Sequence, residues 1–189
     1  MKNRYKSIKE KLRATNDIIS GVDDCWYLWK EISLKEKNMK YSNVLDKYFG
    51  FWTKTRHAYL FYVIVSIAKL FDRGKDVVSF KELIKGLKKQ RTNHQELDKV
   101  ELILNDCTKT KDGVEKIRNN LYAHLNKESI SRDFFAEANV SPDDISELIC
   151  NCKQIMTIFW EMVNESLMPV GDNHFEQLME ALMKKETNG

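Results

Sequence analysis

The residue types needed to cleave a phosphodiester bond without a metal are concentrated in the stretch Arg118-Asn119-Asn120-Leu121-Tyr122-Ala123-His124. The imidazole of His124 can accept and donate a proton near neutral pH, because the unperturbed pKa of histidine is about 6.5. The guanidinium of Arg118 offers a fixed cationic fork that matches phosphate oxygens. Cleavage of RNA needs a base for the ribose 2′-hydroxyl, a cation for the charge on phosphorus and an acid for the leaving 5′-oxygen. The stretch therefore supplies the groups for this reaction.

The spacing of these residues limits how they can act together. On an ideal helix Arg118 and His124 point about 120° apart and lie about 9 Å apart along the axis, whereas Asn120 and His124 share a face. Arg118 must therefore reach round the helix or meet groups from another chain. One chain also supplies one motif imidazole where both an acid and a base are needed. The chemistry thus favours a symmetric homodimer with a composite cleft.

A polar stripe interrupts the most apolar segment of the chain. Its members Tyr62, Ser66, Lys69 and Arg73 lie at i, i+4, i+7 and i+11, with Asp72 beside them. One interpretation is a solvent-facing stripe on a half-buried helix. In the other, the stripe lines the cleft opposite the Arg–His motif, where Lys69 and Arg73 would hold phosphates and Asp72 would orient a catalytic side chain.

The composition predicts an all-α fold. The chain has 7 Gly and 2 Pro in 189 residues, with 42% hydrophobic and 31% charged residues, so turns are few and long helical segments dominate. We expect a single domain over residues 1–189, an antiparallel bundle of five to seven helices. The expected helices cover about 5–37, 44–71, 79–86, 96–107, from 113 through the motif, 141–167 and, at the periphery, 172–186.

Local signals mark several helix ends. Ser141-Pro142-Asp143-Asp144 is a strong start signal, and Ser79 with Glu82 predicts a capping box. The aromatic group Trp26, Trp29, Phe49, Phe51 and Trp52 is expected to belong to the core, although such side chains can also stack on bases.

Charge and cysteine content restrict the ligands and the location. The net charge of +3 is modest, and Lys85, Lys88, Lys89 and Arg91 form a local cluster that either attracts phosphates or is a solvated helix face. One residue separates Cys150 from Cys152, which does not fit a zinc site, so we expect no metal. We also expect no other cofactor. The apolar run 59–71 is shorter than the roughly 20 residues of a bilayer span, and we expect a cytoplasmic protein with no membrane partner.

Spacing alone also fits a structural role, in which Arg118 pairs with a surface acid and His124 caps or packs a helix end. Two segments favour the catalytic interpretation. Ile117-Arg-Asn-Asn-Leu-Tyr-Ala-His-Leu125 resembles the signature of the HEPN superfamily (higher eukaryotes and prokaryotes nucleotide-binding domains). Ser66-Ile-Ala-Lys-Leu-Phe-Asp72 resembles a segment of its abortive-infection U-type (AbiU-like) branch, on the helix beside the motif helix.

This resemblance implies a HEPN-like helical bundle that dimerises through the motif region. Many such proteins are ribonucleases of phage defence, toxin–antitoxin pairs or RNA processing, so the implied partners are RNA and an antitoxin or another defence-system protein. By position, Arg118 and His124 take the catalytic roles, while Asn119 and Asn120 orient phosphate or the imidazole. Asn126 stands where the branch modified by a nucleotidyltransferase has Tyr, which argues against that form of regulation. Because some HEPN proteins are not catalytic, the alternatives are an RNA- or nucleotide-binding or protein-interaction module, and a purely structural helical adaptor.

Overall fold

The computed structural model describes residues 7–34, 39–72, 78–89, 94–123, 134–163 and 175–187. The elements are α1 (Ile8–Ser33), the 3-10 helix η1 (Met39–Tyr41), α3 (Ser42–Lys47), α4 (Phe49–Leu70), α5 (Phe80–Lys89), α6 (His94–Asp106), α7 (Thr108–Ala123), α8 (Phe134–Ala138), α9 (Pro142–Met162) and α10 (Phe175–Thr187). The described residues contain no strand, and the predicted all-α fold is confirmed. Seven of the helices contain ten or more residues, in agreement with the expected five to seven.

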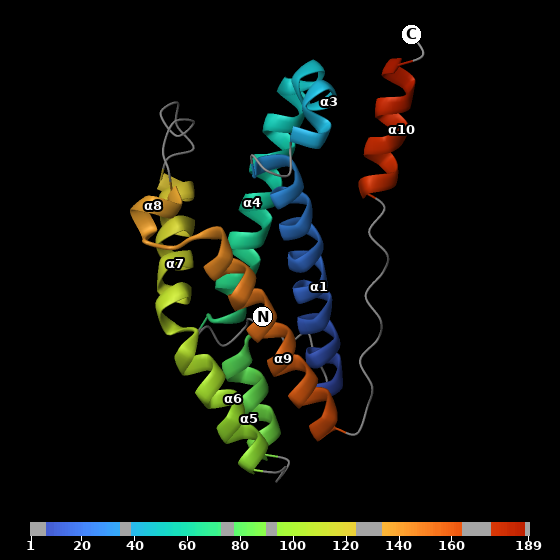
Figure 1. Ribbon diagram of the computed structural model, residues 1–189. Coiled ribbons are helices and arrows are strands. Elements are labelled where there is room, and N and C mark those ends of the chain that lie inside the picture. The colour runs from blue at the N-terminus through green and yellow to red at the C-terminus, as the bar shows by residue number, and fades with distance from the viewer. Residues whose placement is uncertain are drawn as a thin grey trace.

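The bundle is organised around α4. This helix packs between α1 and α7, and α9 lies across α1 and also contacts α6 and α7 (Figure 1). α4 and α7 run in opposite directions, so the start of α4 and the end of α7 lie at the same end of the molecule (Figure 1). The largest apolar cluster joins the four helices and includes Val22, Ile64, Ile67, Ile117 and Leu148.

Two of the predicted core aromatics are at the centre of this cluster. Trp26 and Trp29 of α1 stack with their ring centroids 4.7 Å apart, and both are buried. The indole nitrogen of Trp26 donates a hydrogen bond of 2.8 Å to the hydroxyl of Ser146 on α9. This bond satisfies the polar atom of a buried side chain and fixes α9 against α1.

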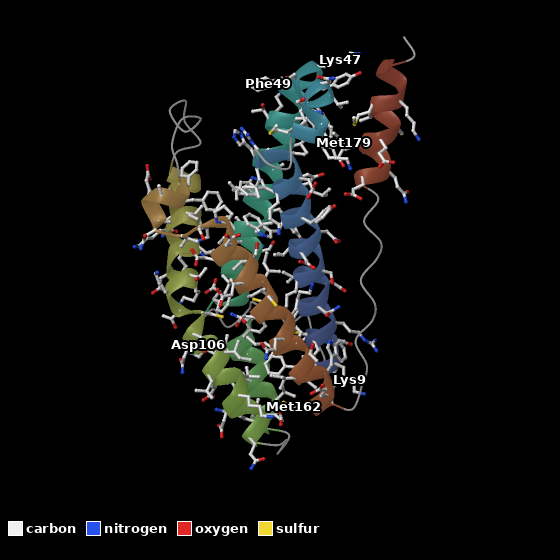
Figure 2. All side chains as sticks on the ribbon, in the orientation of Figure 1. Lys9, Lys47, Phe49, Asp106, Met162 and Met179 are labelled. Carbon is white, nitrogen blue, oxygen red and sulfur yellow. The ribbon has the colours of Figure 1, made fainter. Side chains whose placement is uncertain are left out.

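The same prediction was wrong for Phe49 and Phe51, which are 67% and 61% exposed at the start of α4. Figure 2 shows Phe49 at the outer end of the α3–α4 corner. Here the predicted helix 44–71 is divided, because Tyr48 leaves the helical region with φ −111° and ψ 33°. The break turns α3 toward α10, where Met179 packs against Val44 and points from α10 toward α3 (Figure 2).

Two start signals had different outcomes. At α9 the hydroxyl of Ser141 accepts from the backbone of Asp144, and the Asp144 carboxylate accepts from the backbone of Ser141, so the predicted start is confirmed. At α5 the predicted capping box is wrong. Among the described residues the hydroxyl of Ser79 is buried with no hydrogen-bond partner, and Glu82 lies 3.6 Å from Lys85 instead.

The motif helix begins at Thr108, five residues before the predicted start at Gly113. Gly113 lies inside α7, where α8 and the residues after it come close. Asn139 ends α8 with a φ of 54°, and the amide of Val140 bonds to the carbonyl of Phe135 at 3.1 Å. This turn places Val140 against Gly113, where a Cβ atom would overlap Val140 Cγ2.

No helix in the described part of the chain combines the length and apolar character needed to span a bilayer.

Candidate functional site

The end of α7 positions the first half of the motif. α7 buries Val114 and Ile117 in the apolar cluster that it shares with α4, and Gly113 brings α8 to its side. These contacts fix the rotation of the helix about its axis. Arg118, next to the buried Ile117, is therefore half-buried, and Asn119 is exposed.

Arg118 has no carboxylate within ion-pair distance among the described residues. Its Nε and Nη2 atoms both lie 3.4 Å from Oδ1 of Asn119, so the neighbouring amide accepts two long hydrogen bonds from the guanidinium. Both bonds are weak at this distance. The contact leaves the positive charge of Arg118 without a neutralising acid in the described structure.

Asn120 points to another part of the molecule. Its Nδ2 atom donates a hydrogen bond of 3.3 Å to Oε2 of Glu137 on α8. Successive helical residues differ by about 100°, so Asn120 projects roughly 200° from Arg118. The two predicted substrate-binding amides thus have different partners: Asn119 contacts the arginine, and Asn120 contacts an acid of the next helix.

Glu137 was not found by sequence reasoning, because no local pattern links it to a residue seventeen positions earlier. The Asn120–Glu137 contact exists because α8 folds back along α7. The carboxylate therefore lies beside the motif helix and adds negative charge on the side away from Arg118.

His124 lies outside the described residues, as do Arg73 and Asn126. The described part of α7 ends at Ala123, one residue before the motif histidine. The chain has four histidines, and His57 is the one whose side chain is described. Burial lowers the pKa of His57, and the nearby positive charge of Arg56 lowers it further. The neutral imidazole is therefore favoured at this position of α4.

The polar stripe of α4 is not uniformly solvent-facing. The hydroxyl of Tyr62 lies against α1, since a Cβ atom at Gly21 would be 2.6 Å from it. Ser66 is 8% exposed, whereas Lys69 is exposed and Asp72 is half-buried at the end of the helix. Exposure therefore alternates along the described part of the stripe, because Tyr62 is 41% exposed, Ser66 is buried and Lys69 is exposed again.

Comparison with known proteins supports the resemblance to the HEPN superfamily. A family model described as HEPN AbiU2 matches residues 2–171, a range that contains both the motif and the segment Ser66–Asp72. Neither a curated protein nor a solved structure matches the chain. A match over nearly the whole length, with an all-helical structure, shows that this chain belongs to the HEPN AbiU2 family.

Proposed function

We propose that the protein is a metal-independent endoribonuclease of the HEPN type that acts as a toxin or phage-defence effector. The observation that carries the proposal is the guanidinium of Arg118, which is partly exposed near the end of α7 and has no acidic partner among the described residues. A structural arginine would be expected to pair with an acid, and a phosphate-binding arginine must keep its charge available.

Arg118 would bind the non-bridging oxygens of the scissile phosphate and stabilise the charge that develops on them. His124 would take the proton from the 2′-hydroxyl or deliver one to the 5′-oxygen. Asn119 is a positioning residue, because its side-chain oxygen accepts from two nitrogens of the guanidinium and limits the directions in which it can point.

A second copy of the chain would complete the site. The motif contains one histidine, and the acid and base of the reaction would come from two motifs related by a two-fold axis. Large exposed apolar side chains support self-association. Several of them gather from η1 to the middle of α4, among them Met39, Tyr48, Phe49, Phe51 and Phe61. The start of α4, which carries Phe49 and Phe51, lies at the same end of the molecule as the last turn of α7 (Figure 1).

The test is cleavage of end-labelled RNA in the presence of EDTA. We expect Arg118→Ala to lose about 10²–10³-fold of the rate and His124→Ala about 10²–10⁴-fold. Lys116→Ala is the matched control, because Lys116 is an exposed cation two residues before Arg118 on the same helix. Arg118→Lys should recover part of the loss by restoring the charge without the fork.

Absence of cleavage by folded wild-type protein across varied RNAs would favour the alternative, a non-catalytic HEPN-like RNA- or nucleotide-binding or protein-interaction module. Cleavage that survives both the Arg118 and His124 substitutions would exclude these residues as the site. A monomer at micromolar concentration in light scattering would exclude the composite cleft.

A further inference from the structure

A cavity of about 660 Å³ opens where the end of α4, α5, the end of α6 and the start of α7 meet. Three half-buried apolar side chains, Phe71, Ile84 and Leu104, contribute to its lining. Phe71 is held in place by the fully buried Phe80, with the two rings edge to face and their centroids 5.4 Å apart. The volume falls in the range of pockets that bind small organic groups.

The rest of the lining is strongly basic. It contains five lysines and one acid, Glu101; the lysines are Lys81, Lys85, Lys88, Lys89 and Lys111. Glu101 accepts from Lys88 at 2.7 Å. Among the described residues no carboxylate lies within ion-pair distance of Lys81 or Lys89. Lys85 lies 3.6 Å from Glu82 and Lys111 lies 3.2 Å from Asp112, so the excess positive charge of the lining comes mainly from Lys81 and Lys89. A predominantly positive concave surface concentrates anionic ligands.

The arrangement differs from an ordinary solvated helix face. α5 buries Phe80, Leu83 and Leu87 and presents its four lysines on the opposite side, as any surface helix does. A solvated face, however, needs no cavity beneath it. Here the lysines surround a partly apolar hollow, which matches a ligand with both an aromatic body and negative charges.

α7 carries residues of both the cavity and the candidate site. Lys111 lines the cavity and lies seven residues before Arg118. Seven residues are almost two helical turns, so the two side chains leave the same face of α7 about 10 Å apart along its axis. A polyanion bound at Arg118 would follow this face of α7 past the half-buried Glu115 to reach Lys111 and the cavity.

We propose that this lysine-ringed cavity binds an unstacked nucleotide of the single-stranded RNA that is held at Arg118. The base would enter the apolar hollow beside Phe71, and the lysines would bind the flanking phosphates. This is the usual division of labour in the recognition of single strands, where aromatic side chains stack on bases and cations follow the backbone. The proposal rests on the proposed function for the nature of its ligand, but it concerns a separate set of residues.

The test measures binding of a fluorescent 2′-O-methyl RNA, which lacks the attacking hydroxyl, by anisotropy at several salt concentrations. Lys81→Gln and Lys89→Gln are each compared with Lys54→Gln. Lys54 is also exposed, and it lies sixteen residues before Leu70 on α4, about 24 Å along the axis from the cavity. We expect each cavity variant to reduce the magnitude of the slope of log K against log salt by about 0.7. If a variant and the wild type bind equally at 1 M salt, the variant then binds roughly eightfold more weakly than the wild type at 50 mM salt. The Lys54→Gln slope should equal that of wild type.

A second measurement separates the hollow from the charges. The same oligonucleotide with abasic residues should bind at least about fivefold more weakly to wild type, because the base contact is lost while the phosphates remain. Equal slopes for the cavity variants and Lys54→Gln would overturn the proposal, and so would equal affinity for the abasic strand. Mononucleotides that bind as tightly as the strand would also overturn it, because the site would then serve a free ligand.

Failure of this site and failure of the proposed nuclease are distinguishable. Binding of the uncleavable RNA does not require catalysis, so lysine-dependent binding without cleavage in EDTA refutes only the nuclease. Cleavage that needs Arg118 and His124, with binding insensitive to the cavity lysines, refutes only the cavity.

Discussion

Gly113→Ala tests the close approach between α7 and the turn after α8. The added Cβ atom would overlap Cγ2 of Val140 and lie 3.4 Å from the carbonyl oxygen of Ala138. Val140 is 7% exposed, and its β-branched side chain has little rotational freedom, so it cannot move aside easily. The substitution therefore forces the two segments apart.

Two opposing effects set the magnitude. Replacing an interior helical glycine by alanine favours the helix by about 1 kcal/mol. Overpacking of a buried contact costs about 1–3 kcal/mol, and the severity of the overlap places this case in the upper part of that range. We expect a net loss of about 1–2 kcal/mol in the free energy of unfolding, measured by urea denaturation with circular dichroism.

Gly50→Ala is the matched control, because the space around Gly50 on α4 is open. It should be neutral or stabilising by up to about 1 kcal/mol. The difference between the two glycines then reports the contact with Val140 rather than the loss of a glycine.

A double-mutant cycle with Val140→Ala isolates the contact. Val140→Ala alone removes two buried methyl groups and should cost about 1.5 kcal/mol. In the double variant the added methyl occupies space that the valine has left, so the two costs should not add. We expect a favourable coupling of about 2 kcal/mol. Additive losses, or a Gly113→Ala variant as stable as Gly50→Ala, would refute the reasoning.

Two further predictions concern α9 and the thiols. Ser141→Ala should cost about 1 kcal/mol in the free energy of unfolding. Hydrogen bonds from the backbone and hydroxyl of Ser141 lower the pKa of Asp144, so the ionised carboxylate stabilises the fold above its unfolded pKa of about 3.9. That contribution is lost as the pH falls through the folded pKa. In acid denaturation curves, the free energy of unfolding of Ser141→Ala should therefore decrease less steeply with falling pH than that of the wild type. The same pH dependence in both proteins would contradict this. A thiol reagent under native conditions should modify the exposed Cys150 quickly and the buried Cys107 and Cys152 slowly, since burial raises the pKa of both. Mass spectrometry of the digest identifies the sites, and fast labelling of Cys152 would contradict the packing of α9.

The sequence was informative where the deciding interactions are local. The start of α9 follows from Ser141, Pro142 and Asp144, because a side-chain cap acts within one turn. It was misleading where the environment of a residue is set by packing between helices and not by its neighbours in the chain. Gly113 suggested a helix start, yet it lies inside α7, and its lack of a Cβ atom is explained only by Val140. Ser79 suggested a capping box, but its hydroxyl is buried with no partner among the described residues.

The candidate site divides in the same way. Composition indicated the all-α class, and the resemblance of two short segments to HEPN proteins indicated the family. The same resemblance indicated Arg118 and His124 as the pair to test, because the motif lies within two helical turns of the chain. The residues that contact the motif, and those that surround the cavity, were determined by the tertiary structure. Glu137 meets Asn120 because α8 folds back on α7, and the lysine cluster surrounds an apolar hollow because α4, α5, α6 and α7 converge there. Such contacts depend on how helices pack, and no local pattern in the chain specifies them.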